Sequence, residues 1–151
     1  MQINRRTLLA AGAGLASGIS LPAWAQLRIE ITGVGANQIP IAIPQFQGTN
    51  NAPLDLSAVI SADLERSGAF RSIKVMGELP AEDLQTPRAK FWRTMGANAL
   101  VIGTVEKLAE LRYRVNYRLF DISENKVTDE KQYDVSPQDL RLTAHRIADA
   151  V

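Results

Sequence analysis

The sequence predicts an α/β fold in which a mixed sheet is flanked by helices. Short apolar runs alternate with amphipathic helical patterns, and the pattern of an antiparallel hairpin comes late in the chain. Strand patterns that alternate with helices favour one sheet covered by helices. The 151 residues are 46% hydrophobic and 22% charged, which is ordinary for a single globular domain.

The first 25 residues are predicted to be an export signal. Arg5-Arg6 gives the positive end, residues 8–19 form an apolar stretch, and a small-x-small motif predicts cleavage between Ala25 and Gln26. The apolar stretch is shorter than the roughly 20 residues that span a bilayer. An uncleaved membrane anchor is the alternative interpretation. The arginine pair fits twin-arginine export and general secretion alike.

Composition narrows the functions open to the remaining domain, residues 26–151. Two of the 17 basic residues fall in the leader, so 15 basic residues remain against 16 acidic residues. Nucleic-acid-binding proteins usually carry a concentrated positive charge, so this balance does not predict a nucleic-acid partner. The sequence has no cysteine and a single histidine, His145. The absence of cysteine excludes disulfides, thiolate metal sites and cysteine nucleophiles, and the single histidine disfavours a zinc enzyme, whose site needs three or four ligands. Gly33-Val34-Gly35 lacks the third glycine of a dinucleotide-binding fingerprint.

The first half of the domain contains two strand patterns and a helix. Residues 27–32 alternate between apolar and polar side chains, as in a half-buried strand. Residues 39–44 are almost continuously apolar, which predicts an interior strand. A helix follows, with Asp55 or Ser57 as its cap and Gly68 as a left-handed stop.

The middle of the chain contains two more strand patterns around a helix. Residues 70–75 are predicted to form a strand, and residues 78–85 an acidic, polar connection. Pro87 suits the first turn of a helix that Gly96 ends. Residues 99–105 are the most apolar segment of this domain, so they are expected to form its central strand.

Three arginines share one face of the next strand: Arg112, Arg114 and Arg118. If residues 123–125 form a three-residue turn with Asn125 left-handed, then Arg118 faces Glu130 and Arg114 faces Asp134. Opposite charges across antiparallel strands stabilise the pairing. A solvated face of paired charges is therefore the favoured interpretation, and a phosphate-binding site is the alternative.

A final helix begins at Pro137 and has no stop signal, so the chain is expected to continue. One stripe of this helix is apolar: Leu140, Ala144, Ile147 and Val151. His145 is expected to pack or to form a hydrogen bond, and the alternative is a general base oriented by Asp149. Trp92 is expected in the core, with an exposed ligand platform as its alternative.

The leading strand pattern has a second interpretation. A strand tied to its domain only through residues 32–37 can dock at a sheet edge, or it can leave and add to a partner's sheet. The residues alone favour a plain first strand.

Taken together, these segments resemble the amino-terminal domain of the TolB family. Six stretches carry the resemblance, in order behind an export signal: residues 27–33, 39–46, 60–70, 92–103, 117–121 and 144–151. The resemblance implies a domain akin to anticodon-binding domains, followed in the family by a six-bladed β-propeller that contacts the lipoprotein Pal. The sequence contains no propeller repeat.

The resemblance also implies a non-enzymatic periplasmic adaptor of the Tol-Pal system. Such an adaptor links TolA to Pal for outer-membrane invagination during cell division and for envelope integrity, and it meets membranes only through its partners. TolA binding maps to the mature amino terminus, about residues 26–37, which reverses the preference for a plain strand. The predicted contacts are Gln26, Leu27, Arg28, Ile29, Glu30, Ile31, Thr32 and Gly33. No catalytic, cofactor-binding or metal-binding residue is expected. A ligand- or nucleotide-binding module and a hydrolase that uses His145 are the alternatives from other classes.

Overall fold

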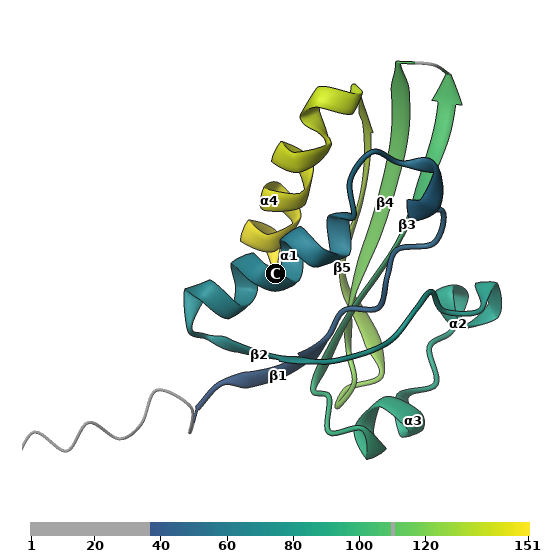
Figure 1. Cartoon of the computed structure of the whole chain (residues 1–151). Helices are drawn as coiled ribbons and strands as arrows, with labels where there is room; N and C mark the ends of the chain where they lie inside the picture. The colour runs from purple at the N-terminus through teal and green to yellow at the C-terminus, as the bar shows by residue number, and fades with distance from the viewer. Residues whose placement is uncertain (1–36, 110) are drawn as a thin grey trace, which may run out of the picture. The chain divides into compact units, whose positions relative to one another are not determined.

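Five strands form one mixed sheet in the order β2-β1-β3-β4-β5 (Figure 1). The computed structural model describes residues 37–109 and 111–151. The strands are β1 (Ile39–Ala42), β2 (Phe70–Ile73), β3 (Ala99–Ala109), β4 (Arg112–Asp121) and β5 (Lys126–Val135). β1 pairs in parallel with β2 and β3, whereas β4 pairs antiparallel with β3 and β5. The predicted interior place of β1 and central place of β3 are confirmed.

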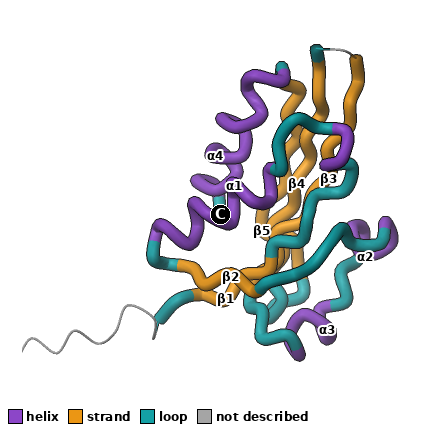
Figure 2. Tube along the Cα trace, in the orientation of Figure 1, coloured by secondary structure: helices purple, strands orange, loops and turns teal. Residues whose placement is uncertain are grey.

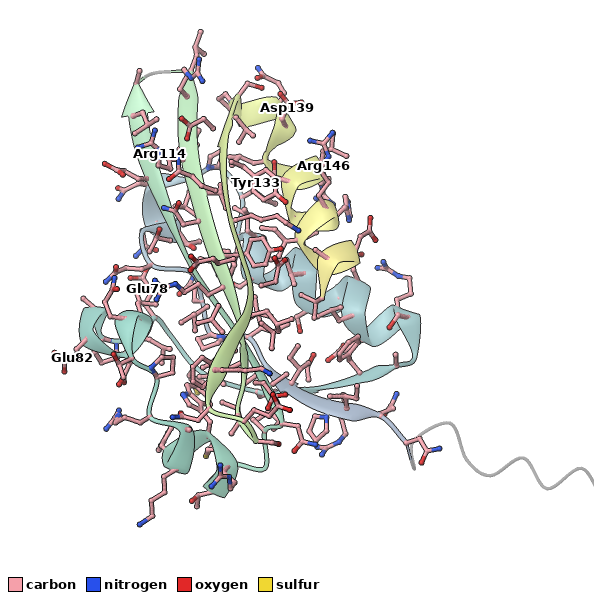
Figure 3. All side chains as sticks on the ribbon, turned by 180° about the vertical axis from the view of Figure 1, so that it is seen from behind. Glu78, Glu82, Arg114, Tyr133, Asp139 and Arg146 are labelled. Carbon is pink, nitrogen blue, oxygen red and sulfur yellow. The ribbon has the colours of Figure 1, made fainter. Side chains whose placement is uncertain are left out.

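The helices lie on opposite faces of this sheet (Figures 1 and 2). They are α1 (Leu56–Ser67), α2 (Ala81–Gln85), α3 (Ala89–Thr94) and α4 (Leu140–Ala150), with short 3-10 turns η1 (Thr49–Asn51) and η2 (Pro137–Asp139). We name the face covered by α1 and α4 the closed face, and the face that carries α2 and α3 the open face. Tyr133 of β5 lies beside α4, whereas Glu82 lies on α2, away from α4 (Figure 3).

The closed face holds the larger core. Val101 and Val115 project from the sheet and are fully buried, as are Ile60 from α1 and Ile147 from α4. Burying one such aliphatic side chain contributes about 1.5–3 kcal/mol. The predicted apolar stripe of the last helix is confirmed, since three of its members are fully buried and Val151 packs at the edge of the same cluster.

A glycine in β3 lets the loop after β1 lie directly on the sheet. Phe46 is fully buried over Gly103, where a Cβ would come within 2.4 Å of the Phe46 ring and 2.6 Å of the Asn116 carbonyl oxygen. The next residue pairs with β3: Gln47 N donates to Gly103 O at 3.0 Å, and Val105 N donates to Gln47 O at 2.8 Å. At Gln47 the loop therefore pairs beside β3 as a one-residue parallel bridge opposite Thr104, while the Phe46 ring covers Gly103.

The ends of α1 follow the predicted signals. Asp55 is the cap, since its Oδ1 accepts a hydrogen bond from Ala58 N at 3.3 Å. Ser57 instead donates its hydroxyl to the Asp55 carboxylate. Gly68 adopts the left-handed conformation with φ of 76°, which a residue without a side chain adopts at no steric cost.

The predicted connection at residues 78–85 is wrong in part, because it contains α2. Glu82 and Asp83 stand in its first turn, where negative charge favours a helix. Asp83 is buried, and its carboxylate accepts two hydrogen bonds from Arg88 at 3.0 and 2.8 Å.

Several predicted boundaries differ from the observed ones. The strands predicted over residues 39–44 and 70–75 end at Ala42 and Ile73. The helix predicted from Pro87 begins at Ala89, and the last helix opens with the 3-10 turn η2 before α4 starts.

The β4–β5 register is confirmed, but the predicted three-residue turn is wrong. Arg114 faces Asp134 and Arg118 faces Glu130, as expected. Because Asp121 pairs with Lys126, the turn has four residues, 122–125, and a register shift after Leu119 restores the predicted pairing. The Asp121 carboxylate selects this turn by accepting from the amides of residues 123 and 124 at 2.7 and 2.9 Å. Asn125 is left-handed, as predicted, with φ of 54°.

A smaller cluster lies under one end of the open face. Trp92 of α3 is only 2% exposed and packs with Leu100 and Phe120 of the sheet, so its predicted core position is confirmed. The predicted leader lies outside the described residues. Within the described part of the chain, no helix is both long and apolar enough to cross a bilayer.

Candidate functional site

The residues predicted to bind TolA, Gln26 to Gly33, lie outside the described residues, as does the predicted cleavage point after Ala25. The described chain starts at Asn37 and is fixed immediately. Gln38 Nε2 donates to Gly68 O at 3.2 Å, and Ile39 N donates to Ala69 O at 2.9 Å. The leading segment therefore joins the domain at the start of an interior strand, beside the end of α1.

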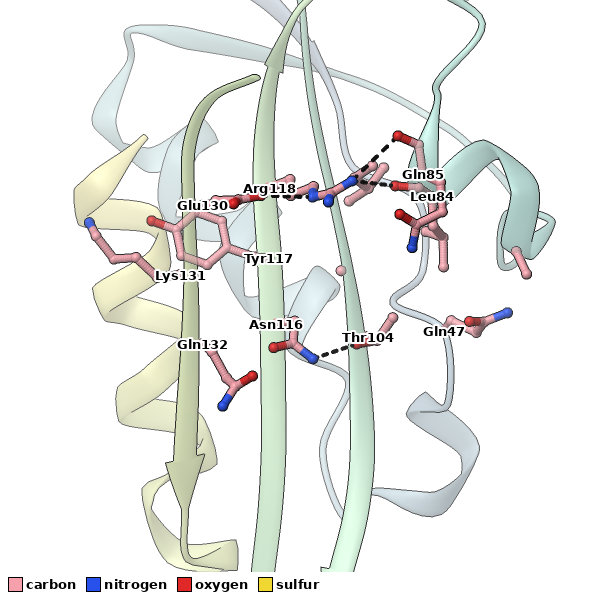
Figure 4. A pocket seen from close by; sticks show the side chains of 13 residues that line it. Gln47, Leu84, Gln85, Thr104, Asn116, Tyr117, Arg118, Glu130, Lys131 and Gln132 are labelled. Atoms are coloured by element: carbon pink, nitrogen blue, oxygen red, sulfur yellow. Dashed lines mark hydrogen bonds and ion pairs between the residues drawn. The ribbon is translucent and has the colours of Figure 1, made fainter. Parts of the chain in front are cut away.

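A groove of about 500 Å³ lies on the open face next to α2 (Figure 4). Strands β3 and β4 form its floor, with α2 on one side and β5 on the other. Thr104, Asn116 and Gln132 face one another across the three strands. Asn116 Nδ2 donates to Thr104 Oγ1 at 3.1 Å. This bond uses only the amide nitrogen, so the side-chain oxygen Oδ1 of Asn116 is left as an acceptor at the groove.

Three glutamines place carboxamides around the groove. Gln47 comes from the loop on β3, Gln85 from the end of α2, and Gln132 from β5. Among residues 37–109 and 111–151, none of these three side chains forms a hydrogen bond with another residue. The groove is therefore bordered by neutral groups that can both donate and accept.

Arg118 ties α2 to the sheet at one end of the groove (Figure 4). Its Nε donates to Glu130 Oε2 at 2.9 Å, and its Nη1 donates to the carbonyls of Leu84 and Gln85 at 3.1 and 3.4 Å. A cation at the last carbonyls of a helix is stabilising. The Arg118 guanidinium therefore joins the β4–β5 strand pair to the carboxyl end of α2.

Arg114 is engaged in a similar way. Its Nε and Nη2 donate to the two carboxylate oxygens of Asp134, each at 2.8 Å, and this guanidinium lowers the pKa of the Asp134 carboxyl. The predicted face of paired charges is thus confirmed for Arg114 and Arg118, whereas Arg112 is exposed. Two of the three arginines needed for the phosphate-site alternative are already bound to carboxylates.

A third charge cluster lies on the closed face at β5, because Tyr117 and Lys131 alternate with the groove residues Asn116 and Gln132 along their strands. The Tyr117 hydroxyl donates to the Asp129 carboxylate, and Lys131 Nζ donates to Asp129 Oδ2 at 3.1 Å. Burial raises the pKa of Tyr117, and the bond to Asp129 raises it further. The same bond, followed by that from Lys131, lowers the pKa of Asp129. Tyr117 is therefore a neutral donor at ordinary pH.

His145 links the two helices of the closed face. Its Nδ1 is hydrogen-bonded to the Asp63 carboxylate on α1, which also accepts from Arg66 Nη1 at 2.7 Å. These bonds, with that from His145 first, lower the pKa of Asp63. The hydrogen-bonding role predicted for His145 is confirmed, and its carboxylate partner is Asp63 rather than Asp149.

The groove is the feature that sequence reasoning missed. Its cross-strand row followed from the predicted register, because Asn116 faces Gln132 whenever Arg118 faces Glu130. Gln47 and Gln85 could not be placed there, since their positions depend on how a loop and a short helix pack. Within the described residues, no three His, Asp or Glu side chains are grouped so as to hold a metal ion.

Sequence comparison places the chain in a family. The sequence model described as the TolB amino-terminal domain matches residues 27–128. The chain belongs to the TolB family. It is 44% identical over 149 residues to the Tol-Pal system protein TolB of Polaromonas sp. (strain JS666 / ATCC BAA-500), a match that covers 99% of this chain and 34% of that protein. The protein of the same name from Albidiferax ferrireducens is 44% identical over 131 residues, which are 87% of this chain and 31% of that protein.

Structural comparison agrees with this membership. The crystal structure of TolB from Acinetobacter baumannii matches the TolB-family domain described above with a TM-score of 0.62 and 27% identity. The match covers 75% of this chain and 27% of that chain. The present chain spans about a third of the length of the curated relatives that it matches. The resemblance stated from the sequence is therefore confirmed.

Proposed function

We propose that this TolB-family chain acts as a non-enzymatic periplasmic adaptor of the Tol-Pal system. Its family membership carries the proposal, since relatives at 44% identity over 99% and 87% of its length bear the name Tol-Pal system protein TolB. The adaptor links TolA to the outer-membrane lipoprotein Pal, for outer-membrane invagination during cell division and for envelope integrity. In the relatives the matched region is about a third of the protein, and the Pal contact is proposed for a propeller outside that third.

The TolA contact is proposed for Gln26 to Gly33 by exchange of a strand. Residues 27–32 alternate in polarity, so their backbone can pair with a partner's sheet while one face buries apolar side chains. Leu27, Ile29 and Ile31 contribute at most about 1.5–3 kcal/mol each when buried. A partner shifts such a segment only by its differential affinity, and an adaptor needs that free-energy gap to be small.

Calorimetry with TolA tests this contact. Deleting residues 26–32 is expected to abolish binding while the thermal unfolding of the domain is retained. Ile29→Asp is expected to weaken binding by about tenfold or more, roughly 1.4 kcal/mol, because it places a charge on the apolar side of the strand. Arg28→Ala, on the polar side, is the matched control and is expected to change little. Unchanged affinity after the deletion overturns the assignment of TolA binding to this segment.

A further inference from the structure

We propose that the groove on the open face binds a neutral N-acetylated glycan, such as an oligomer of β-1,4-linked N-acetylglucosamine. The site consists of described residues of β3, β4, β5 and α2 together with Gln47. It shares no residue with the predicted TolA contact, so it stands or falls independently of the proposed function.

The charges around the groove favour a neutral ligand. Arg118 is bound to Glu130 and to two carbonyls of α2, so the guanidinium and the carboxylate that line the groove are already paired. A charged ligand would lose hydration on entering without gaining an unpaired counter-charge from these groups. A ligand rich in hydroxyl and amide groups avoids that cost.

The carboxamides supply the matching hydrogen bonds. Gln47, Gln85 and Gln132 approach the groove from three different elements, and the Asn116 carbonyl faces it from the floor (Figure 4). Each carboxamide offers two donor hydrogens and an acceptor oxygen. Neighbouring sugar hydroxyls and the acetamido group present the same combination. A volume of about 500 Å³ is within the range of small-ligand sites.

One part of the groove is apolar. Ala81 and Leu84 of α2 and Ile102 of β3 line it together with the amides. An acetamido group has a methyl beside its polar atoms, and a pyranose ring has C–H faces, so both ligand parts suit a groove of mixed lining.

The floor of the groove disfavours an extended peptide. At the groove, β3 pairs with β4 and with Gln47, and β4 pairs with β3 and β5, so the floor offers no free edge there to which a peptide backbone could add. The free edge of β5 lies on the side of that strand away from the floor. Contacts with the floor therefore come from side chains on a sheet face, which suits a flat ring better than an extended backbone.

An NMR titration of the mature chain with tri-N-acetylchitotriose tests the proposal. Saturable shifts of the side-chain amide signals of Gln47, Gln85 and Gln132 are expected, with a dissociation constant on the order of 1 mM for so open a site. Gln132→Ala and Gln85→Ala are each expected to weaken binding about fivefold. Gln138→Ala removes an exposed amide in η2, outside the groove, and is expected to leave affinity unchanged.

Two further ligands separate the alternatives. The deacetylated glucosamine trimer is cationic and is expected to bind at least about tenfold more weakly. A neutral tripeptide, acetyl-Ala-Gln-Ala-amide, is expected to cause no saturable shift. The proposal would be overturned by saturable shifts with the tripeptide but not with the glycan, or by the absence of shifts with up to about 10 mM glycan. It would also be overturned if Gln138→Ala lowered the affinity for the glycan as much as Gln132→Ala and Gln85→Ala do.

Discussion

The two faces of the sheet are built differently. On the closed face, α1 with 12 residues and α4 with 11 residues pack along the strands and exclude water from a continuous apolar core. On the open face, α2 with five residues and α3 with six residues lie beside a groove that polar side chains border. Helices that short depend on their tertiary contacts for stability.

The contacts that hold α2 and α3 are accordingly of another kind. Trp92 is their one fully buried aromatic anchor among the described residues. Leu84 and Ala89 pack at the edge of the same cluster, and Arg88, Arg93 and Arg118 add polar bonds. Because the closed face holds the larger buried cluster, we expect it to provide most of the stability of the domain. The open face leaves the hydrogen-bonding groups of the groove exposed.

Removing the anchor of the open face is expected to have the largest effect. Trp92→Ala should lower the free energy of unfolding by about 3–5 kcal/mol, because the indole is 2% exposed and contacts strands that both faces share. Urea denaturation measures this change. Phe91→Ala is the control: its ring is 46% exposed, and the expected loss is about 1 kcal/mol. Equal losses would show that the open-face cluster is no part of the cooperative core.

Crowding the closed face at β3 is expected to cost less. Gly103→Ala should destabilise the domain by about 1–3 kcal/mol, since the new Cβ meets both the Phe46 ring and the backbone oxygen of Asn116. A double-mutant cycle with Phe46→Leu should reduce this cost without abolishing it, because the Asn116 contact remains. A cost unaffected by Phe46→Leu would contradict the close approach of the loop to the sheet.

The link between α1 and α4 predicts a smaller, pH-dependent effect. The pKa of Asp63 is lowered from 3.8, so its carboxylate stabilises the fold above that value, and this contribution disappears as the pH falls through the folded-state pKa. Relative to Asp63→Asn, the parent should lose up to about 1 kcal/mol of stability below pH 4. Thermal unfolding from pH 6 to 3 measures the difference. Asp149 is exposed on α4, so Asp149→Asn should keep the parental dependence of stability on pH. A weaker pH dependence in that variant would mean that Asp149, not Asp63, is the carboxylate partner of His145.

Features with a clear period could be predicted from the sequence. The buried stripe of α4, the central place of β3 and the opposition of Arg118 to Glu130 follow directly from apolar spacing and charge alternation. α2 could not be recognised, because five residues are too few to show a period and its position depends on Asp83 and Arg118.

The same reason limits prediction of the sites. Gln132 could be placed opposite Asn116 from strand register, whereas Gln47 reaches the groove only because Gly103 lets its loop lie on the sheet. The proposed TolA contact at residues 26–33 depends on polarity alternation and family resemblance, and it stays a prediction.

The smallest expected effect concerns the tie between α2 and the sheet. Arg114→Met and Arg118→Met each remove one guanidinium from a strand pair, so both should change overall stability only slightly. Only Arg118 also bonds the carbonyls of Leu84 and Gln85. Amide hydrogen exchange in residues 81–86 should therefore accelerate in the Arg118 variant and remain parental in the Arg114 variant, because local opening reports local contacts. Equal exchange in both variants would mean that the buried Asp83 and Trp92 hold this segment without help from the sheet's charged face.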